Sequence, residues 1–132
     1  MKKLLLILLC LPIIGFAQSW NQIGQDIDGE AAGDNSGDAV SLSSDGNTVA
    51  IGAPFMTTNS SNSGHVRIYQ NVLGSWSQIG QDIDGEAGGD KSGLSVSLSS
   101  DGNTVAIGAA LNDGNGTDAG HVRIYNYNGT SW

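Results

Sequence analysis

A 56-residue unit that occurs twice in tandem limits the fold of this chain more than any other feature of its sequence. Trp20, Trp76 and Trp132 mark the boundaries of the unit, and residues 21–76 align with 77–132 without a gap and with 37 identical positions. The unit is dense in glycine and in short apolar runs. A repeat of this length and composition is typical of a repeat architecture, and it argues against an enzyme with one active site.

Residues 1–17 are predicted to be a signal peptide. Lys2 and Lys3 form a positive segment, an apolar run follows, and small residues precede a cut after Ala17. The apolar run is too short for a transmembrane helix, so we expect no transmembrane segment. Cys10 follows a leucine and not a small residue, which favours ordinary cleavage over lipid attachment. The leader therefore predicts a secreted or cell-surface protein, exported through a cleaved signal peptide.

The composition of the mature chain, 18–132, limits the classes of partner that it can bind. It contains no cysteine, so no disulfide can stabilise it although export would permit one. Its three basic residues (Arg67, Lys91 and Arg123) and 13 acidic residues leave a net charge of −10. Such a charge argues against nucleic acid and anionic membrane surfaces as partners. It fits a soluble exported protein or a protein that binds cations.

Turn signals and alternating apolar residues predict four short strands in each unit and no helix of useful length. The predicted strands of the first unit are 22–27, 39–43, 48–53 and 64–69, each with a counterpart 56 residues later. A tight turn is expected at 44–47, where Asp-Gly and Gly-Asn tolerate positive φ. Ala50, Gly52 and Ala53 in the third strand would let neighbouring sheets approach closely.

Four strands per unit of this length is the pattern of a propeller blade. We therefore predict an all-β fold, a partial β-propeller with two tandem four-stranded antiparallel propeller-type blades. The predicted domains are the signal peptide at 1–17, one blade at 18–76 and a second blade at 77–132. The second unit ends where the pattern asks for a further strand, so we expect the repeats to continue beyond it.

The unit resembles an FG-GAP repeat, the family that builds the seven-bladed propellers of integrin α subunits and occurs in large secreted bacterial proteins. The resemblance covers residues 20–132 and rests on the order of four motifs, which in the first unit are 40–43, 45–47, 51–54 and 64–69. The unit departs from the family in two motifs. Ser36-Gly37 and Ser92-Gly93 stand where the family has Phe-Gly, and Ala110 replaces the proline of Gly-Ala-Pro in the second unit. In integrins an acidic calcium loop lies between the second and third strands. Here only one carboxylate is present in that turn, so the family's site is not carried over.

An earlier loop is a separate calcium candidate, because alternating carboxylates in a glycine-rich loop can converge on a hard cation. The alternative is a solvated acidic loop whose aspartates cap their own turns. The spacing is the same in both units, although its glycine does not match the EF-hand position. The candidate metal residues are Asp26, Asp28, Glu30 and Asp34, repeated as Asp82, Asp84, Glu86 and Asp90.

The other candidates for chemistry favour structural roles. His65 and His121 occupy equivalent positions one unit apart, which is too far for a shared metal site or a catalytic triad. No nucleophile elbow, P-loop or cysteine nucleophile is present, so no catalytic residue is proposed. The stretch 112–118 differs completely in charge from its counterpart 56–62, which predicts a variable surface loop. The three tryptophans favour packing at blade edges over sugar stacking.

Together these features predict a non-catalytic, secreted or cell-surface adhesion or interaction scaffold built from FG-GAP-like propeller repeats. We expect an extracellular protein or glycan as partner, with calcium as the one conceivable cofactor. Two alternatives stay open: the propeller domain of a secreted enzyme whose catalytic part lies beyond residue 132, and a calcium-dependent lectin-like oligomer. Two blades leave open sheet faces and edges. We expect either further blades in the same chain, of which this would be the N-terminal part, or self-association, for example of three chains into a six-bladed ring.

Overall fold

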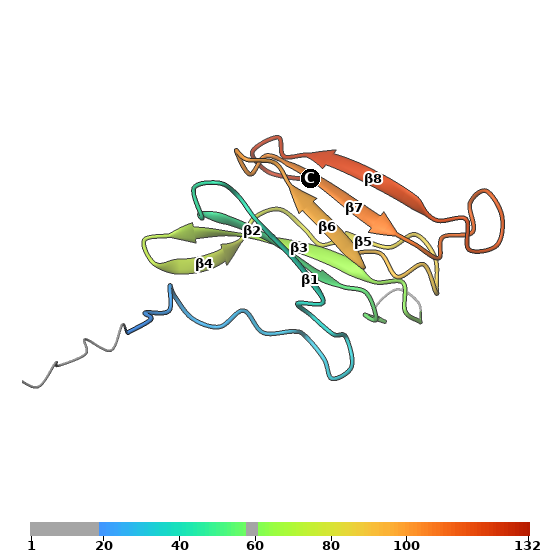
Figure 1. Cartoon of the computed structure of the whole chain (residues 1–132), viewed down its shortest axis with the longest axis horizontal. Coiled ribbons are helices and arrows are strands. Elements are labelled where there is room, and N and C mark those ends of the chain that lie inside the picture. Colours follow the sequence, from blue (N-terminus) through green and yellow to red (C-terminus); the bar gives the residue numbers. More distant parts are fainter. Residues whose placement is uncertain (1–18, 58–60) are drawn as a thin grey trace, which may run out of the picture.

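The computed structural model describes residues 19–57 and 61–132, and the predicted signal peptide lies outside this range. The described residues form two antiparallel β-sheets and contain no helix, so the prediction of an all-β chain is confirmed. Figure 1 shows the two sheets one above the other, with the N-terminal segment running along the outside of the first. Each sheet belongs largely to one repeat, which is why the molecule has two similar layers.

The first sheet has five strands in which β1, β2, β3 and β4 follow one another and β5 also pairs with β3. The second sheet has three strands in the order β6, β7, β8. The strands of the first sheet are β1 (Ala39–Leu42), β2 (Thr48–Ala53), β3 (His65–Val72), β4 (Ser75–Gln78) and β5 (Ile83–Asp84). Those of the second sheet are β6 (Ser95–Leu98), β7 (Thr104–Ala109) and β8 (His121–Asn126).

The predicted tight turn joins β1 to β2, and side chains close it. The Ser43 hydroxyl donates to Asp45 at 2.6 Å and accepts a hydrogen bond from the amide of Thr48 at 2.9 Å. The hydrogen bonds that Asp45 accepts, first of all from Ser43, hold its pKa below the ordinary value. Ser99 and Asp101 repeat this arrangement between β6 and β7. Identical sequences therefore fold identically at these two turns.

The prediction of four strands in each unit is wrong for the first strand. Residues 22–27 form no strand, and their counterparts in the second unit belong to the sheet of the first, where β4 and β5 lie along β3. A strand forms only where a partner edge satisfies its backbone groups. Residues 78–84 find that edge on β3, whereas the described chain before 22–27 contains no strand that could supply one.

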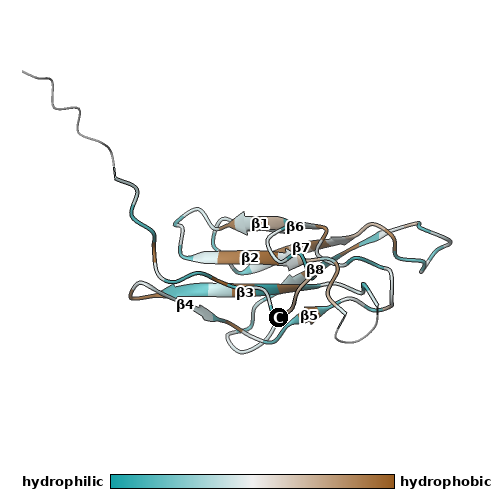
Figure 2. Ribbon diagram, turned by 90° about the horizontal axis from the view of Figure 1, so that it is seen from below, coloured by the Kyte–Doolittle hydropathy of each residue, from teal (hydrophilic) through white to brown (hydrophobic). Residues whose placement is uncertain are grey.

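The two sheets stack face to face through a small apolar core. Figure 2 shows the strands of both sheets in the same order, with β1 and β6 at one edge, then β2 and β7, and then β3 and β8. The core consists of buried side chains from both repeats: Ala50, Val66, Ile68, Ile83, Leu98, Val105 and Ile107. At Gly52 an added Cβ would lie 2.0 Å from the backbone oxygen of Gly93, so only glycine permits this approach. This approach is the role that the sequence predicted for Gly52.

Candidate functional site

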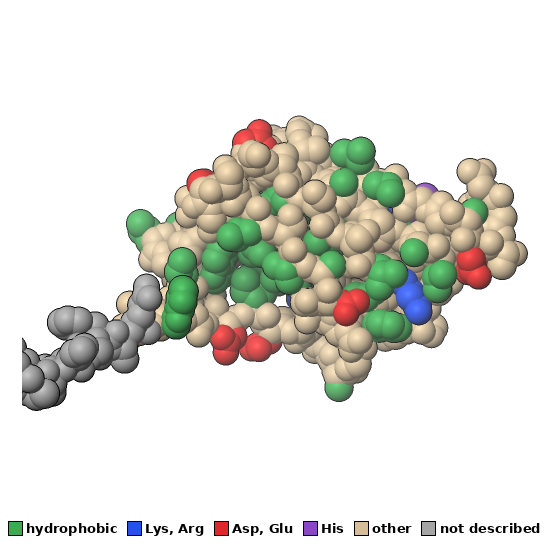
Figure 3. Space-filling view, viewed as in Figure 1, with side chains coloured by type: hydrophobic (Ala, Val, Ile, Leu, Met, Phe, Trp, Pro, Cys, Tyr) green, Lys and Arg blue, Asp and Glu red, His purple; other side chains and the backbone are tan. Residues whose placement is uncertain are grey.

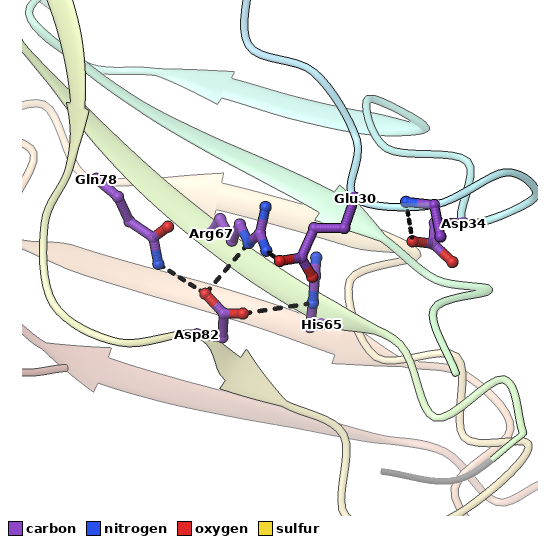
Figure 4. Close-up of polar contacts among 7 residues, drawn as sticks. Glu30, Asp34, His65, Arg67, Gln78 and Asp82 are labelled. Atoms are coloured by element: carbon purple, nitrogen blue, oxygen red, sulfur yellow. Dashed lines mark hydrogen bonds and ion pairs between the residues drawn. The ribbon is translucent and has the colours of Figure 1, made fainter. Parts of the chain in front are cut away.

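Where the first repeat joins the second, charged side chains from three segments meet over the outward-facing side of β3 (Figure 4). Arg67 in β3 forms ion pairs with Glu30 from the preceding loop and with Asp82 from the next repeat, the latter with a 3.2 Å hydrogen bond from Nε. Gln78 donates to the same Asp82 oxygen at 2.6 Å. One arginine therefore connects acidic residues of both repeats.

The environment of this cluster keeps Asp82 ionised. Burial opposes ionisation, but hydrogen bonds from Gln78 and Arg67 together with the charge of Arg67 outweigh it and hold the pKa of Asp82 below its ordinary value. His65 is 3% exposed, and its Nδ1 lies 3.9 Å from Asp82 without a hydrogen-bond partner. The histidine thus borders the cluster, while Arg67 holds it together.

The cluster has some features of a metal site. Glu30, His65 and Asp82 each offer one ligand atom, and these atoms all lie within 4.8 Å of one another. However, two carboxylates and one nitrogen are far fewer ligands than the six to eight oxygens that calcium prefers. Arg67 already supplies the positive charge that both carboxylates need. The residues present therefore fit an ion-pair network better than a calcium site.

The second repeat builds only part of the same cluster. Glu86 lies 3.5 Å from Arg123, as Glu30 pairs with Arg67 in the first repeat, but it also lies 3.8 Å from His121, whereas His65 faces Asp82. Arg123 also donates to the backbone carbonyl of Asp84. The position equivalent to Asp82 would fall in a further repeat, and the buried Nε of Arg123 has no hydrogen-bond partner. The second cluster is therefore incomplete where the first is closed.

The acidic residues predicted to hold calcium are thus divided among several roles. Glu30, Asp82 and Glu86 join the two arginine clusters described above. Asp34 and Asp90 are buried and cap their own loops, because each accepts a hydrogen bond from the backbone amide three residues earlier, at 3.0 and 3.1 Å. This capping matches the alternative interpretation of these loops.

The remaining three of the acidic residues predicted to hold calcium lie outside these two loop caps. Asp26 is exposed and accepts a 2.7 Å hydrogen bond from Gln22, Asp28 is exposed, and Asp84 lies in β5. Among the described residues, the single group of three potential ligands combines His65 with one carboxylate from each repeat. It does not consist of the four carboxylates of one loop. Calcium binding by these residues stays a prediction.

The predicted variable loop packs against the acidic loop at one end of the sheets. In the second repeat Asn112 donates to the Asp90 carboxylate at 2.8 Å, and the amide of Leu111 lies 3.4 Å from the Asp90 carbonyl. In the first repeat the amide of Phe55 contacts the Asp34 carbonyl in the same way. The loop between β7 and β8 projects from the right-hand end of the molecule in Figure 1. A fixed acidic loop thus supports a loop of variable sequence.

Two of the boundary tryptophans hold each repeat to its own beginning. Trp76 donates from Nε1 to the Ile23 carbonyl at 2.8 Å, and Trp132 donates to the Ile79 carbonyl at 2.9 Å. Trp20, at the start of the first repeat, is 91% exposed. The packing role predicted for the tryptophans agrees with the contacts of Trp76 and Trp132.

The sequence interpretation missed the arginines as organising residues. Arg67 and Arg123 are two of the three basic residues of the mature chain, and they fall at the same place in the repeat. In so acidic a chain, that coincidence was the available signal that each arginine faces acidic side chains.

Comparisons with known proteins give no assignment. A scan against protein-family models finds no match to the chain, and a search of curated proteins finds no relative. In the part of the chain that the structure describes, we find no helix with the length and apolar character needed to cross a membrane.

Proposed function

We propose that the chain is a non-catalytic, exported adhesion or interaction scaffold built from FG-GAP-like propeller repeats. Each sheet would act as a blade, and the loops at one end would hold an extracellular protein or glycan. The signal peptide predicted at 1–17 supports export. The acidic surface supports a partner that is neither nucleic acid nor an anionic membrane.

One observation carries the proposal: the two repeats differ where they form loops and agree where they form sheets. Nine of the ten positions in 54–63 and all five in 70–74 differ from their counterparts, whereas only five of the other 41 positions differ. Residues 48–53, which form β2, are identical in β7. Loops of variable sequence on a constant framework are typical of proteins that bind through those loops.

The structure makes the second-repeat loop suitable for such a role. Residues 113–119 are all exposed, and hydrogen bonds from Asn112 to Asp90 and from the amide of Asp118 to Asp113 fix the loop at its base. A loop held in this way loses less conformational entropy when a partner binds. Its exposed amide and carboxylate groups suit a polar partner.

A loop exchange tests the proposal. In the test variant, residues 110–119 are replaced by the sequence of 54–63, so both repeats carry the same loop. The matched control, Leu94→Asp, also makes the second repeat resemble the first, but at an exposed position outside the loop. Both proteins are compared with the wild type on glycan arrays and panels of extracellular proteins, after circular dichroism has verified the fold.

We expect the wild type and Leu94→Asp to bind the same ligand saturably, and the loop variant to lose at least tenfold in affinity. A tenfold loss corresponds to about 1.4 kcal/mol, which is the contribution of one or two polar contacts. Equal binding by the loop variant, or no saturable binding to any extracellular protein or glycan, would overturn the proposal.

A further inference from the structure

The N-terminal arm, residues 19–28, repeats the sequence of a segment that forms two strands elsewhere in the molecule. Residues 75–84 differ from it at one position in ten, where Ser77 replaces Asn21. In that second copy, β4 and β5 pair with the edge of β3. The arm itself forms no strand and is exposed except at the half-buried Ile27. The arm therefore has a sequence that pairs with a strand edge in its second copy, but no described strand offers such an edge to the arm.

The missing edge is present at the other end of the molecule. Strand β8 begins with the five residues that begin β3, His-Val-Arg-Ile-Tyr. Strand β3 pairs with β2 on one side and with β4 and β5 on the other, whereas β8 pairs only with β7 among the described strands. Its outer edge leaves backbone donors and acceptors free for another strand. Edge and arm are thus the two separated halves of a contact that the chain already makes once.

The charged side chains at these two places complement each other as well. The buried Nε of Arg123 lacks a hydrogen-bond partner, whereas Nε of Arg67 donates to Asp82. The counterpart of Asp82 in the arm is Asp26, which is exposed and accepts a hydrogen bond from Gln22 as Asp82 does from Gln78. An arm placed on β8 as β4 and β5 lie on β3 would bring Asp26 to Arg123.

The exposed apolar faces of the two sheets also complement each other. Val122 and Ile124 on the outward face of the second sheet are 65% and 69% exposed, although their counterparts Val66 and Ile68 are buried in the core. On the outward face of the first sheet Val40 and Leu42 are 58% and 56% exposed. Figure 3 shows hydrophobic side chains at the surface of the first sheet beside the N-terminal segment. The outward face of the second sheet is thus the counterpart of the inward face of the first sheet. The outward face of the first sheet is likewise the counterpart of the inward face of the second.

We infer that a second copy of this chain occupies the open end. The arm of one copy pairs with β8 of its neighbour, and the first sheet of the copy that supplies the arm stacks on the second sheet of that neighbour. The internal contact fixes the register, with Asn21 opposite Asn126 and Ile27 opposite Val122, as Ser77 lies opposite Gln70 and Ile83 opposite Val66. The contact is head-to-tail, so it extends to rings or open chains. It does not depend on what the loops bind.

The arm is already held in a suitable place. Ile23 and Gln25 contact Trp76 through the same kinds of hydrogen bond that Ile79 and Gln81 make to Trp132. Residues 79–81 keep those bonds while their neighbours pair with β3, since the amide of Ile79 also donates to the Ile68 carbonyl at 2.9 Å. One segment can therefore contact its own tryptophan and a neighbouring strand together.

Disulfide trapping between copies tests the register. The full chain carries Cys10→Ser throughout, and two single-cysteine variants, Asn21→Cys and Asn126→Cys, are purified separately and mixed under a glutathione redox buffer. In the control mixture Gln70→Cys replaces Asn126→Cys. Gln70 is the exposed counterpart of Asn126, but Ser77 already lies opposite it. Intact mass identifies each covalent dimer.

We expect the Asn21–Asn126 pair to form the mixed dimer at least tenfold faster than the control pair. Light scattering of the wild type should show a mass that rises with concentration, and Asp26→Asn should weaken that association about tenfold, since hydrogen bonds to charged groups contribute most strongly. A wild type that stays monomeric at high concentration, or equal trapping in both mixtures, would overturn the inference and leave the β8 edge to a different partner.

Discussion

Identical isoleucines in the two repeats should differ strongly in their contribution to stability. Ile68 is 1% exposed in the core between the sheets, whereas Ile124, in the same sequence context, is 69% exposed. Substitution by alanine removes three carbons, which contribute about 2.4 kcal/mol of transfer free energy when fully buried. The cavity left at Ile68 adds to this loss, so we expect Ile68→Ala to lower the free energy of unfolding by about 3–4 kcal/mol. At Ile124 only about a third of the transfer term applies, or about 0.8 kcal/mol.

Urea denaturation followed by tryptophan fluorescence measures both losses, because Trp132 packs against the core. The measurement belongs at protein concentrations where the unfolding midpoint no longer changes with concentration, since Ile124 also lies on the face assigned to self-association. Val66→Ala and Val122→Ala form a second matched pair with the same expected order. Equal losses for Ile68→Ala and Ile124→Ala would show that the two sheets do not stack through β3 in solution, and the packing argument would fail.

Three further substitutions probe the close approach of the sheets, the charged cluster and the turn, and the first and third have a matched counterpart in the second repeat. Gly52→Ala should cost about 3 kcal/mol in urea denaturation, because its Cβ would lie 2.0 Å from a backbone oxygen, whereas Gly108→Ala meets only a serine hydroxyl and should cost less than about 1 kcal/mol. Since the folded-state pKa of Asp82 is lowered, its contribution is present above the ordinary carboxyl pKa and is lost as pH falls through the folded value. Asp82→Asn should therefore reduce the free energy of unfolding by about 1 kcal/mol at pH 7, and this effect should shrink as the pH is lowered below the ordinary carboxyl pKa; an effect that does not change with pH would contradict the ion pair. Ser43→Ala removes two hydrogen bonds made by a buried side chain and should lower the thermal midpoint by several degrees more than Ser99→Ala, whose side chain is only half-buried.

Sequence periodicity was a good guide to the strands that pair within one repeat. The predicted strand at 48–53 has those bounds in the structure, and the turn at 44–47 lies where Asp-Gly placed it. Such hairpins depend on neighbouring residues, which the sequence shows directly. The strand predicted at 22–27 is absent because strand formation there requires an edge outside the unit, and the pattern of one segment carries no information about whether that edge exists.

The same limit explains what could be inferred about the site. Glu30 was singled out as a carboxylate in an acidic loop, but its partner Arg67 lies 37 residues further along the chain. Asp82 joins them only because the next repeat begins alongside β3. The spacing of carboxylates within one loop suggested that they bind a metal cation. The positive group that Glu30 and Asp82 contact depends instead on residues far away in the sequence. Here that cation is the guanidinium of Arg67.

The structural unit is therefore shifted relative to the sequence unit, and this shift couples the repeats. Residues 78–84 start the second sequence unit, yet they complete the sheet of the first and, through Ile79, contact the tryptophan that ends the second. Neither unit can satisfy its last strand, its arginine or its apolar face without the start of another. Nearest-neighbour contacts of this kind make repeat proteins cooperative along the chain. Among the described strands they also leave the arm and the outer edge of β8 unmatched. Because arm and edge lie at opposite ends of the repeat pair, the association proposed above would run in one direction only.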